Sequence, residues 1–85
     1  MTDAPFEPVT IAEIRKNARE TIIVKLDQFK GSLILHAWNW YLAPDGRWLA
    51  GRSGLAIALH HLPALADALQ KALTSAIERG HLPPS

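Results

Sequence analysis

Cysteine is absent from this chain of 85 residues, which excludes disulfide bonds and thiolate metal sites. No apolar run is long enough to cross a bilayer, so no membrane partner is expected. The first ten residues, MTDAPFEPVT, hold acids and prolines where a secretion signal has a basic and then an apolar region, and we expect no signal peptide. These absences favour a cytoplasmic protein.

Hydrophobic residues make up 48% of the chain and charged residues 20%, which is too apolar for disorder and indicates a globular domain. A domain of this length buries only about 60–65% of its unfolded surface, so a monomer is expected to be marginally stable. We therefore expect the chain to gain stability by forming a dimer.

The charges are distributed unevenly along the chain. The formal net charge is +1, yet the segment from Arg15 to Arg52 holds seven basic against three acidic residues, a net of +4, and the remainder has a net of −3. A basic segment of this kind fits a polyanionic partner. Because any solvated sheet face also needs charges, the charge pattern alone leaves both interpretations open.

Five short stretches rich in β-branched and apolar residues predict an antiparallel meander. Turn signals separate them at Arg15–Arg19, Phe29–Gly31, Pro44–Gly46 and Gly51–Gly54. Ahead of the first stretch, prolines and a lack of periodicity predict a flexible tail over residues 1–8. The predicted stretches are residues 9–14, 20–26, 32–42, 47–50 and 55–59.

The last element has the periodicity of an amphipathic helix. Pro63 suits its first turn, and Gly80 ends it before a short tail over residues 81–85. Asp67 and Lys71 are spaced for an i,i+4 ion pair. Because the apolar stripe is broad and the domain small, we expect part of it to pack on the sheet and part on a second copy of the chain. The predicted dimer contacts are Leu62, Leu65, Leu69, Leu73 and Ile77.

The longest stretch, residues 32–42, alternates between two kinds of side chain. The aliphatic Leu33, Leu35 and Ala37 share one face and are expected to look toward the helix. Trp38 and Trp40 share the other face and are expected to look outward. Indoles beside basic residues are typical of a platform for single-stranded nucleic acid, on which each base stacks with about 1–3 kcal/mol. In the alternative interpretation, the tryptophans fill a core or the dimer interface.

Four motifs follow one another between Phe29 and Gly54: Phe29-Lys30-Gly31, Trp40-Tyr41, Asp45-Gly46 and Gly51-Arg52-Ser53-Gly54. In their order and spacing, they resemble the DNA-binding domain of the positive-cofactor-four family. Members of this family are single-stranded-DNA-binding transcriptional coactivators, and some are bacterial. Residues 11–26 look like the opening strand of bacterial members, and residues 62–73 fit the family's C-terminal helix.

The resemblance implies an α+β fold over residues 9–80, in which a four-stranded antiparallel β-meander precedes one C-terminal amphipathic α-helix and two chains form a homodimer. It also implies sequence-tolerant binding of single-stranded or melted DNA by a transcriptional coactivator or regulator that is not an enzyme and needs no cofactor or metal. By their positions in the motifs, Phe29 and Tyr41 would stack on bases. The predicted DNA-binding residues are Lys16, Arg19, Lys25, Phe29, Lys30, Trp38, Trp40, Tyr41, Arg47 and Arg52.

The chain departs from the family pattern at several positions. Ser32, Trp38 and Ser53 stand where the family often has basic residues. Because each lost phosphate contact lowers both the affinity and its salt dependence, we expect DNA binding that is weaker and depends more on stacking. The alternative function is a protein-interaction module of the same fold that contacts the transcription machinery and binds DNA weakly.

The histidines give little support to a metal site or an enzyme. His60 and His61 are expected on opposite faces of a strand end, while His36 and His81 belong to distant elements. No pair has the i,i+4 helical spacing of metal ligands. The sequence also lacks a nucleophile elbow and a glycine-rich phosphate loop, so catalysis is not expected.

Overall fold

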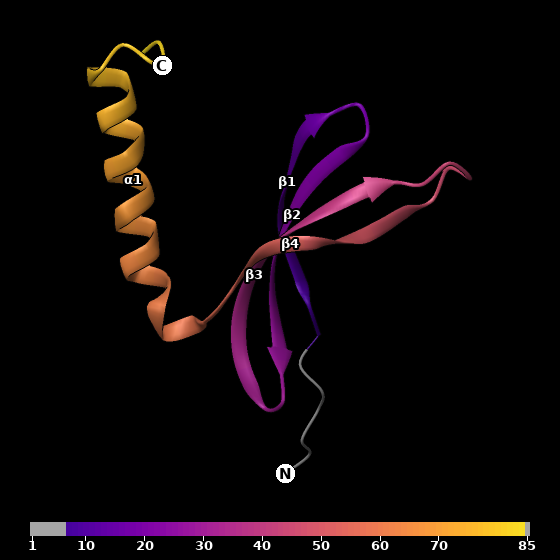
Figure 1. The fold of residues 1–85 in the computed structure, drawn as a ribbon. Coiled ribbons are helices and arrows are strands. Elements are labelled where there is room, and N and C mark those ends of the chain that lie inside the picture. Colours follow the sequence, from indigo (N-terminus) through magenta and orange to yellow (C-terminus); the bar gives the residue numbers. More distant parts are fainter. Residues whose placement is uncertain (1–6, 85) are drawn as a thin grey trace.

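The computed structural model describes residues 7–84, which form one antiparallel sheet followed by one long helix (Figure 1). Four strands lie in the order β1-β2-β3-β4, so each strand pairs with its neighbours in sequence. The predicted α+β meander with a C-terminal helix is therefore confirmed. The elements are β1 (Val9–Asn17), β2 (Glu20–Phe29), β3 (Ser32–Leu42), β4 (Trp48–Ala58), the 3₁₀ turn η1 (Leu59–His61) and α1 (Leu62–Glu78).

The β2–β3 hairpin is the most regular part of the sheet. Its ladder runs without a break from the Glu20–Tyr41 pair to the Phe29–Ser32 pair. Lys30 and Gly31 form the two-residue turn with φ values of 50° and 83°. Two positive φ values in succession are the geometry of a hairpin turn that matches the strand twist, and glycine adopts such a value without a steric cost.

The last strand differs from the prediction. A bend at Gly51–Gly54 between two short strands was expected. The chain does bulge there, because Gly51, Arg52 and Ser53 stand where β3 has Asn39 alone, but β4 continues through the bulge as one strand. A Cβ at Gly51 would lie 2.8 Å from the backbone oxygen of Asn39, and a Cβ at Gly54 would lie 2.7 Å from that of Ala37. The two glycines therefore allow close approach of neighbouring strands, a second use of glycine that sequence alone does not separate from a turn.

The first two strands are also longer than predicted. The basic turn expected over Arg15–Arg19 narrows to Ala18 and Arg19, because β1 continues to Asn17. Asn17 closes the turn by accepting a hydrogen bond from the Arg19 amide at 2.9 Å. Polar side chains do not interrupt β1, since it is an edge strand that is exposed along its whole length. Of the tail predicted over residues 1–8, only Glu7 and Pro8 lie within the described residues.

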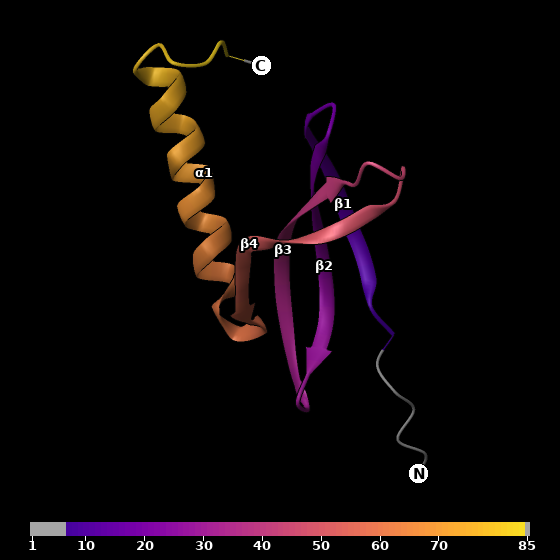
Figure 2. The ribbon, with the colours of Figure 1, turned by 45° about the vertical axis from the view of Figure 1, so that its right-hand side comes forward.

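Helix α1 stands clear of the sheet, to which η1 connects it (Figures 1 and 2). Its ends match the prediction: Pro63 lies in the first turn, and Gly80, with φ of 79°, follows the helix and donates its amide hydrogen to Ile77. The Asp67 and Lys71 side chains form the expected ion pair at 3.0 Å.

The apolar stripe of α1 is uncovered within this chain. Leu69 is 61% exposed and Leu73 is 46% exposed, and Leu35 and Ala43 are the buried hydrophobic residues of the described chain. The expectation that part of the stripe packs on the sheet of the same chain is therefore wrong. The radius of gyration is 15.9 Å, whereas a compact chain of this length has about 12 Å.

Candidate nucleic-acid interface

The register divides the side chains between two unlike faces of the sheet. Paired residues of neighbouring antiparallel strands point to the same face. One face, here called the aliphatic face, carries Ile22, Val24, Leu26, Leu35, Ala37, Leu55 and Ile57. The opposite face, here called the tryptophan face, carries Arg15, Thr21, Ile23, Lys25, Phe29, His36, Trp38, Trp40 and Trp48.

Trp38 lies flat against β4 on the tryptophan face. Its Nε1 donates a hydrogen bond of 2.9 Å to the backbone oxygen of Gly51. The indole also fills the space above Gly54, because a Cβ there would lie 2.4 Å from Trp38 Cε3. Trp38 points away from the aliphatic face, as expected, yet it is half-buried and one side of its ring is covered.

Trp40, also half-buried, has a cation beside its ring. Lys25 Nζ lies 5.6 Å from the ring centroid, within the range of a cation–π interaction. The strand pairing places Trp40 between Thr21 and Ala50. The arrangement keeps a positive charge next to an aromatic surface of the tryptophan face.

The two aromatic residues predicted to stack on bases are both exposed, Phe29 by 61% and Tyr41 by 41%. They are not brought together. Phe29 lies at the β2–β3 turn, with Lys30 Nζ 5.4 Å from its ring centroid. Tyr41 lies at the other end of the same hairpin and on the opposite face, about 30 Å away at the usual rise of a strand.

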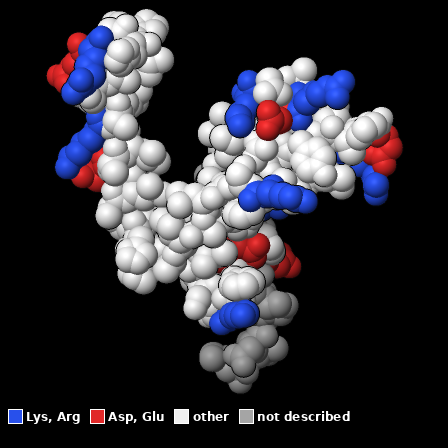
Figure 3. Space-filling model, viewed as in Figure 1, with Lys and Arg blue, Asp and Glu red and all other residues white. Residues whose placement is uncertain are grey.

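The predicted basic residues fall into two groups. Lys16 Nζ is 3.9 Å from Glu20 Oε2, and Arg47 Nε is 2.7 Å from Asp45 Oδ2 within the β3–β4 turn. A neighbouring carboxylate therefore offsets part of the charge of each. Arg19 and Arg52 are exposed and form no ion pair with any described residue. Lysine and arginine gather over the end of the sheet where the β1–β2 and β3–β4 turns lie (Figure 3).

Two carboxylates of the sheet are held in the charged form. Asn17 and Asn39 each donate a hydrogen bond of 3.0 Å to Glu20 and, together with the nearby Lys16 charge, lower the pKa of its carboxyl group. The Gln28 amide donates to Asp27 at 2.7 Å, and His36 lies 3.3 Å from its other oxygen, so the pKa of Asp27 is lowered as well.

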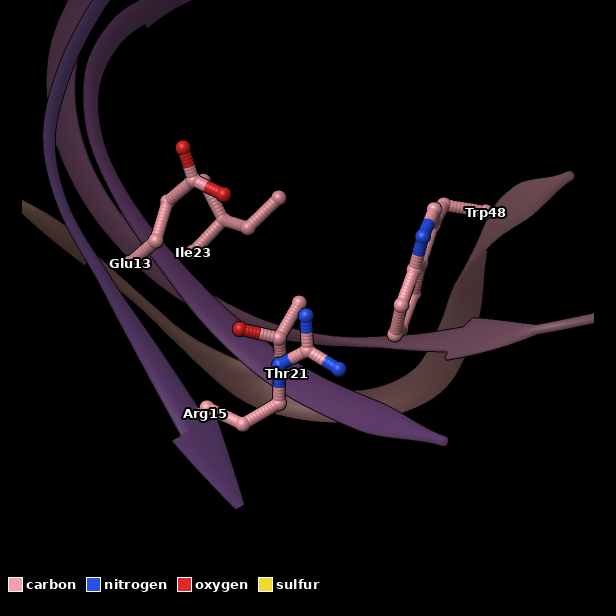
Figure 4. A pocket seen from close by; sticks show the side chains of 5 residues that line it. All are labelled: Glu13, Arg15, Thr21, Ile23 and Trp48. Atoms are coloured by element: carbon pink, nitrogen blue, oxygen red, sulfur yellow. The ribbon is translucent and has the colours of Figure 1, made fainter. Parts of the chain in front are cut away.

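A cavity that the sequence did not predict lies at the end of the tryptophan face. It has a volume of about 350 Å³ and is lined by Glu13, Arg15, Thr21, Ile23 and Trp48 (Figure 4). The Arg15 guanidinium carbon lies 5.1 Å from the Trp48 ring centroid. Arg15 had been assigned to a turn and Trp48 to a four-residue strand, so neither could be placed on a face. The alternation of polar and apolar residues through β1 was the available signal.

The histidines take a different arrangement from the one predicted. His60 and His61 lie in η1 with ring centroids 4.1 Å apart, so placing them on opposite faces of a strand end was wrong. Among residues 7–84, no three histidine or acidic side chains are close enough to hold a metal ion. The described part of the chain also has no helix that is long and apolar enough to span a membrane.

No protein-family model and no curated protein matches the sequence. Two solved structures resemble it. One is a PC4 homologue from Burkholderia pseudomallei, with a TM-score of 0.68 and 23% identity, covering 82% of this chain and 95% of that one. The other is the bacteriophage T5 homologue of the eukaryotic transcription coactivator PC4, and this phage protein is implicated in recombination-dependent DNA replication. Its TM-score is 0.61 and its identity 17%, and the match covers 89% of this chain and 83% of that one. The chain therefore has the fold of PC4 homologues.

Proposed function

We propose that the chain is a bacterial-type member of the positive-cofactor-four family and binds single-stranded or melted DNA as a homodimer, with a role in transcription. The tryptophan face supplies the main support. Three cations lie against three aromatic rings along this face: Arg15 on Trp48, Lys25 on Trp40 and Lys30 on Phe29. Sequence-tolerant binding of single strands uses this combination, because every base has a face that can stack and every nucleotide has a phosphate.

The helix supports the homodimer. The chain exposes 6795 Å², whereas a folded monomer of this mass exposes about 5,000 Å². The excess is larger than the roughly 800 Å² that each partner buries in a standard interface. Leu62, Leu65, Leu69, Leu73 and Ile77 form the proposed contact stripe.

The fold supports a role with DNA. The T5 homologue is implicated in recombination-dependent DNA replication, and both neighbours are homologues of PC4, a transcription coactivator. Phosphate contacts are assigned to Lys16, Arg19, Lys25, Lys30, Arg47 and Arg52, and stacking to Phe29, Trp38, Trp40 and Tyr41.

The proposal is tested by titrating a labelled single-stranded oligonucleotide at several salt concentrations, with duplex DNA as competitor. We expect saturable binding at low salt, weak competition by duplex, and an affinity that falls as salt rises. Lys25→Ala is expected to make the logarithmic salt slope shallower by about 0.7, the value for one single-strand phosphate contact. Lys71→Ala removes the same charge from the helix and is expected to leave the slope unchanged. Absence of saturable binding by the wild type sinks the proposal.

A second candidate is a protein-interaction module of the same fold that contacts the transcription machinery. Ser32 and Ser53 favour it, because both are exposed and uncharged where the family resemblance implies basic residues. This candidate predicts poor binding of the oligonucleotide at every salt concentration, and burial of Trp40 by a polypeptide partner.

A further inference from the structure

The cavity between Trp48 and the β1–β2 hairpin has the chemistry of a pocket for one flat, polar ring. Figure 4 shows the Trp48 indole across an open space from Glu13 and Ile23, with the Arg15 guanidinium reaching toward the indole. The volume of about 350 Å³ lies at the lower end of the range for small-molecule sites, which is about 300–1,000 Å³. One nucleoside-sized group therefore matches the space better than a larger ligand.

Two residues that line the cavity are held by hydrogen bonds within the sheet. Thr21 is buried, and its Oγ1 donates a hydrogen bond of 3.1 Å to the Ile14 backbone oxygen, which ties β2 to β1. Arg15 Nη1 donates to the Ala18 backbone oxygen at 3.3 Å while its guanidinium lies against Trp48. A preformed site of this kind loses little conformational entropy when it binds a ligand.

The charges of the cavity select a base rather than a phosphate. Glu13 places a carboxylate in the wall, which repels an anion, and it forms no ion pair with any described residue. Arg15 is two residues away along the same strand and offers hydrogen-bond donors beside that acceptor. Bases of single strands present both donors and acceptors on their free edges.

We propose that this cavity binds one nucleobase and prefers a base with an exocyclic amino group, such as cytosine, to thymine. The base stacks on the part of the Trp48 indole that the Arg15 guanidinium leaves uncovered. Arg15 donates to the acceptors of the base, and Glu13 accepts a hydrogen bond from the amino group, as acidic side chains do from cytosine N4. Thymine places carbonyl oxygens on both sides of its single N–H, and these repel the carboxylate. This inference rests on the proposed function, because it adds a base preference to single-strand binding.

The test compares oligo(dC) and oligo(dT) of equal length, titrated at pH 8 into wild type and variants. We expect the wild type to bind oligo(dC) at least about tenfold more tightly, as one charge-assisted hydrogen bond allows. Glu13→Ala is expected to remove this preference, whereas Trp48→Ala is expected to weaken binding of both oligonucleotides. Glu78→Ala, which removes a carboxylate from the helix, serves as the control and is expected to keep the preference.

The outcomes separate the two proposals. Equal binding of both oligonucleotides by the wild type, or a preference that persists in Glu13→Ala, overturns the base pocket and leaves single-strand binding intact. No saturable binding of either oligonucleotide overturns the proposed function, and the pocket with it. Trp48→Phe retains an aromatic wall and is expected to bind at least threefold more tightly than Trp48→Ala. If the two variants bind alike while both remain folded by circular dichroism, Trp48 is not a stacking wall.

Discussion

The sheet and the helix of this chain differ in how far they are stabilised by their own contacts. Within the sheet, Trp38 is hydrogen-bonded across to β4, Thr21 to β1, and Glu20 to two asparagines. Helix α1 has well-formed ends and one surface ion pair, but Leu69 and Leu73 in its apolar stripe are exposed. The residues that could bind a ligand thus lie on the sheet, whose strands are linked by side-chain hydrogen bonds. The uncovered apolar stripe lies on the helix.

In the proposed function, DNA binding and dimerisation therefore use separate surfaces of one short chain. A change in the helix stripe is expected to act on subunit association first. A change on the tryptophan face is expected to act on the sheet and on DNA binding first. Variants that affect only one of the two properties therefore provide the critical tests of the comparison.

The largest effect is expected from a charge in the helix stripe. Leu69→Asp places a carboxylate where the proposed dimer buries an aliphatic side chain, and desolvating that charge costs about 3 kcal/mol or more of association free energy. Sedimentation equilibrium is expected to show a monomer at concentrations at which the wild type is a dimer. Gln70→Asp adds the same charge beside the stripe and is expected to remain dimeric. A dimeric Leu69→Asp variant would show that the stripe is not the interface.

An intermediate effect is expected from Gly54→Ala on the sheet. The added Cβ would lie 2.4 Å from Trp38 Cε3 and 2.7 Å from the Ala37 oxygen, so the indole or the strand must move. Such overpacking costs about 1–3 kcal/mol of unfolding free energy, measurable by urea denaturation. Oligonucleotide affinity is expected to fall while the dimer is retained. Unchanged stability would mean that β4 adjusts freely at this position.

A double mutant separates the two clashes. Combining Gly54→Ala with Trp38→Ala relieves the contact with the indole but not the contact with the Ala37 oxygen. The coupling free energy between the two substitutions then measures how much of the loss is due to the ring. A coupling near zero would assign the whole cost to the backbone.

The sequence predicted local features well where a single signal decides the structure. The bounds of β3 follow from an alternating apolar run between two turn signals, and the helix follows from its leucine period and its proline and glycine ends. Gly51 and Gly54 were predicted to separate two strands, whereas they lie at a bulge within one strand, because glycine serves both chain reversal and close strand packing. That error hid the continuity of β4 and, with it, the face on which Trp48 lies.

Other features depend on contacts that no local pattern encodes. The cavity requires Trp48 from β4 to approach Arg15 from β1, which pair with different strands and come together only through the twist of the sheet. The separation of Phe29 from Tyr41 follows from a register that motif order does not give. The predicted packing of part of the helix stripe on the sheet was wrong, because Leu69 and Leu73 stay exposed within this chain.

The smallest effect is expected from lowering the pH. It compares the stability that Asp27 contributes on the sheet with the stability that Asp67 contributes on the helix. Hydrogen bonds from Gln28 and His36 lower the pKa of Asp27 in the folded state. Because the folded value lies below the unfolded one, Asp27 contributes stability above its unfolded pKa of about 4, and this contribution is lost as the pH falls through the folded pKa. Asp27→Asn is thus expected to be less stable than wild type at pH 6, with the difference shrinking below pH 4.

Thermal unfolding of both proteins from pH 6 to pH 3 measures this convergence, with Asp67→Asn as the matched control. Asp67 pairs with Lys71 at 3.0 Å, but both side chains are largely exposed. An exposed i,i+4 pair contributes only about 0.3–0.5 kcal/mol, so this variant is expected to stay close to wild type throughout. If Asp67→Asn changed stability more than Asp27→Asn, the carboxylate on the helix would contribute more to stability than the one on the sheet. The contrast in side-chain support between the two elements would then be wrong.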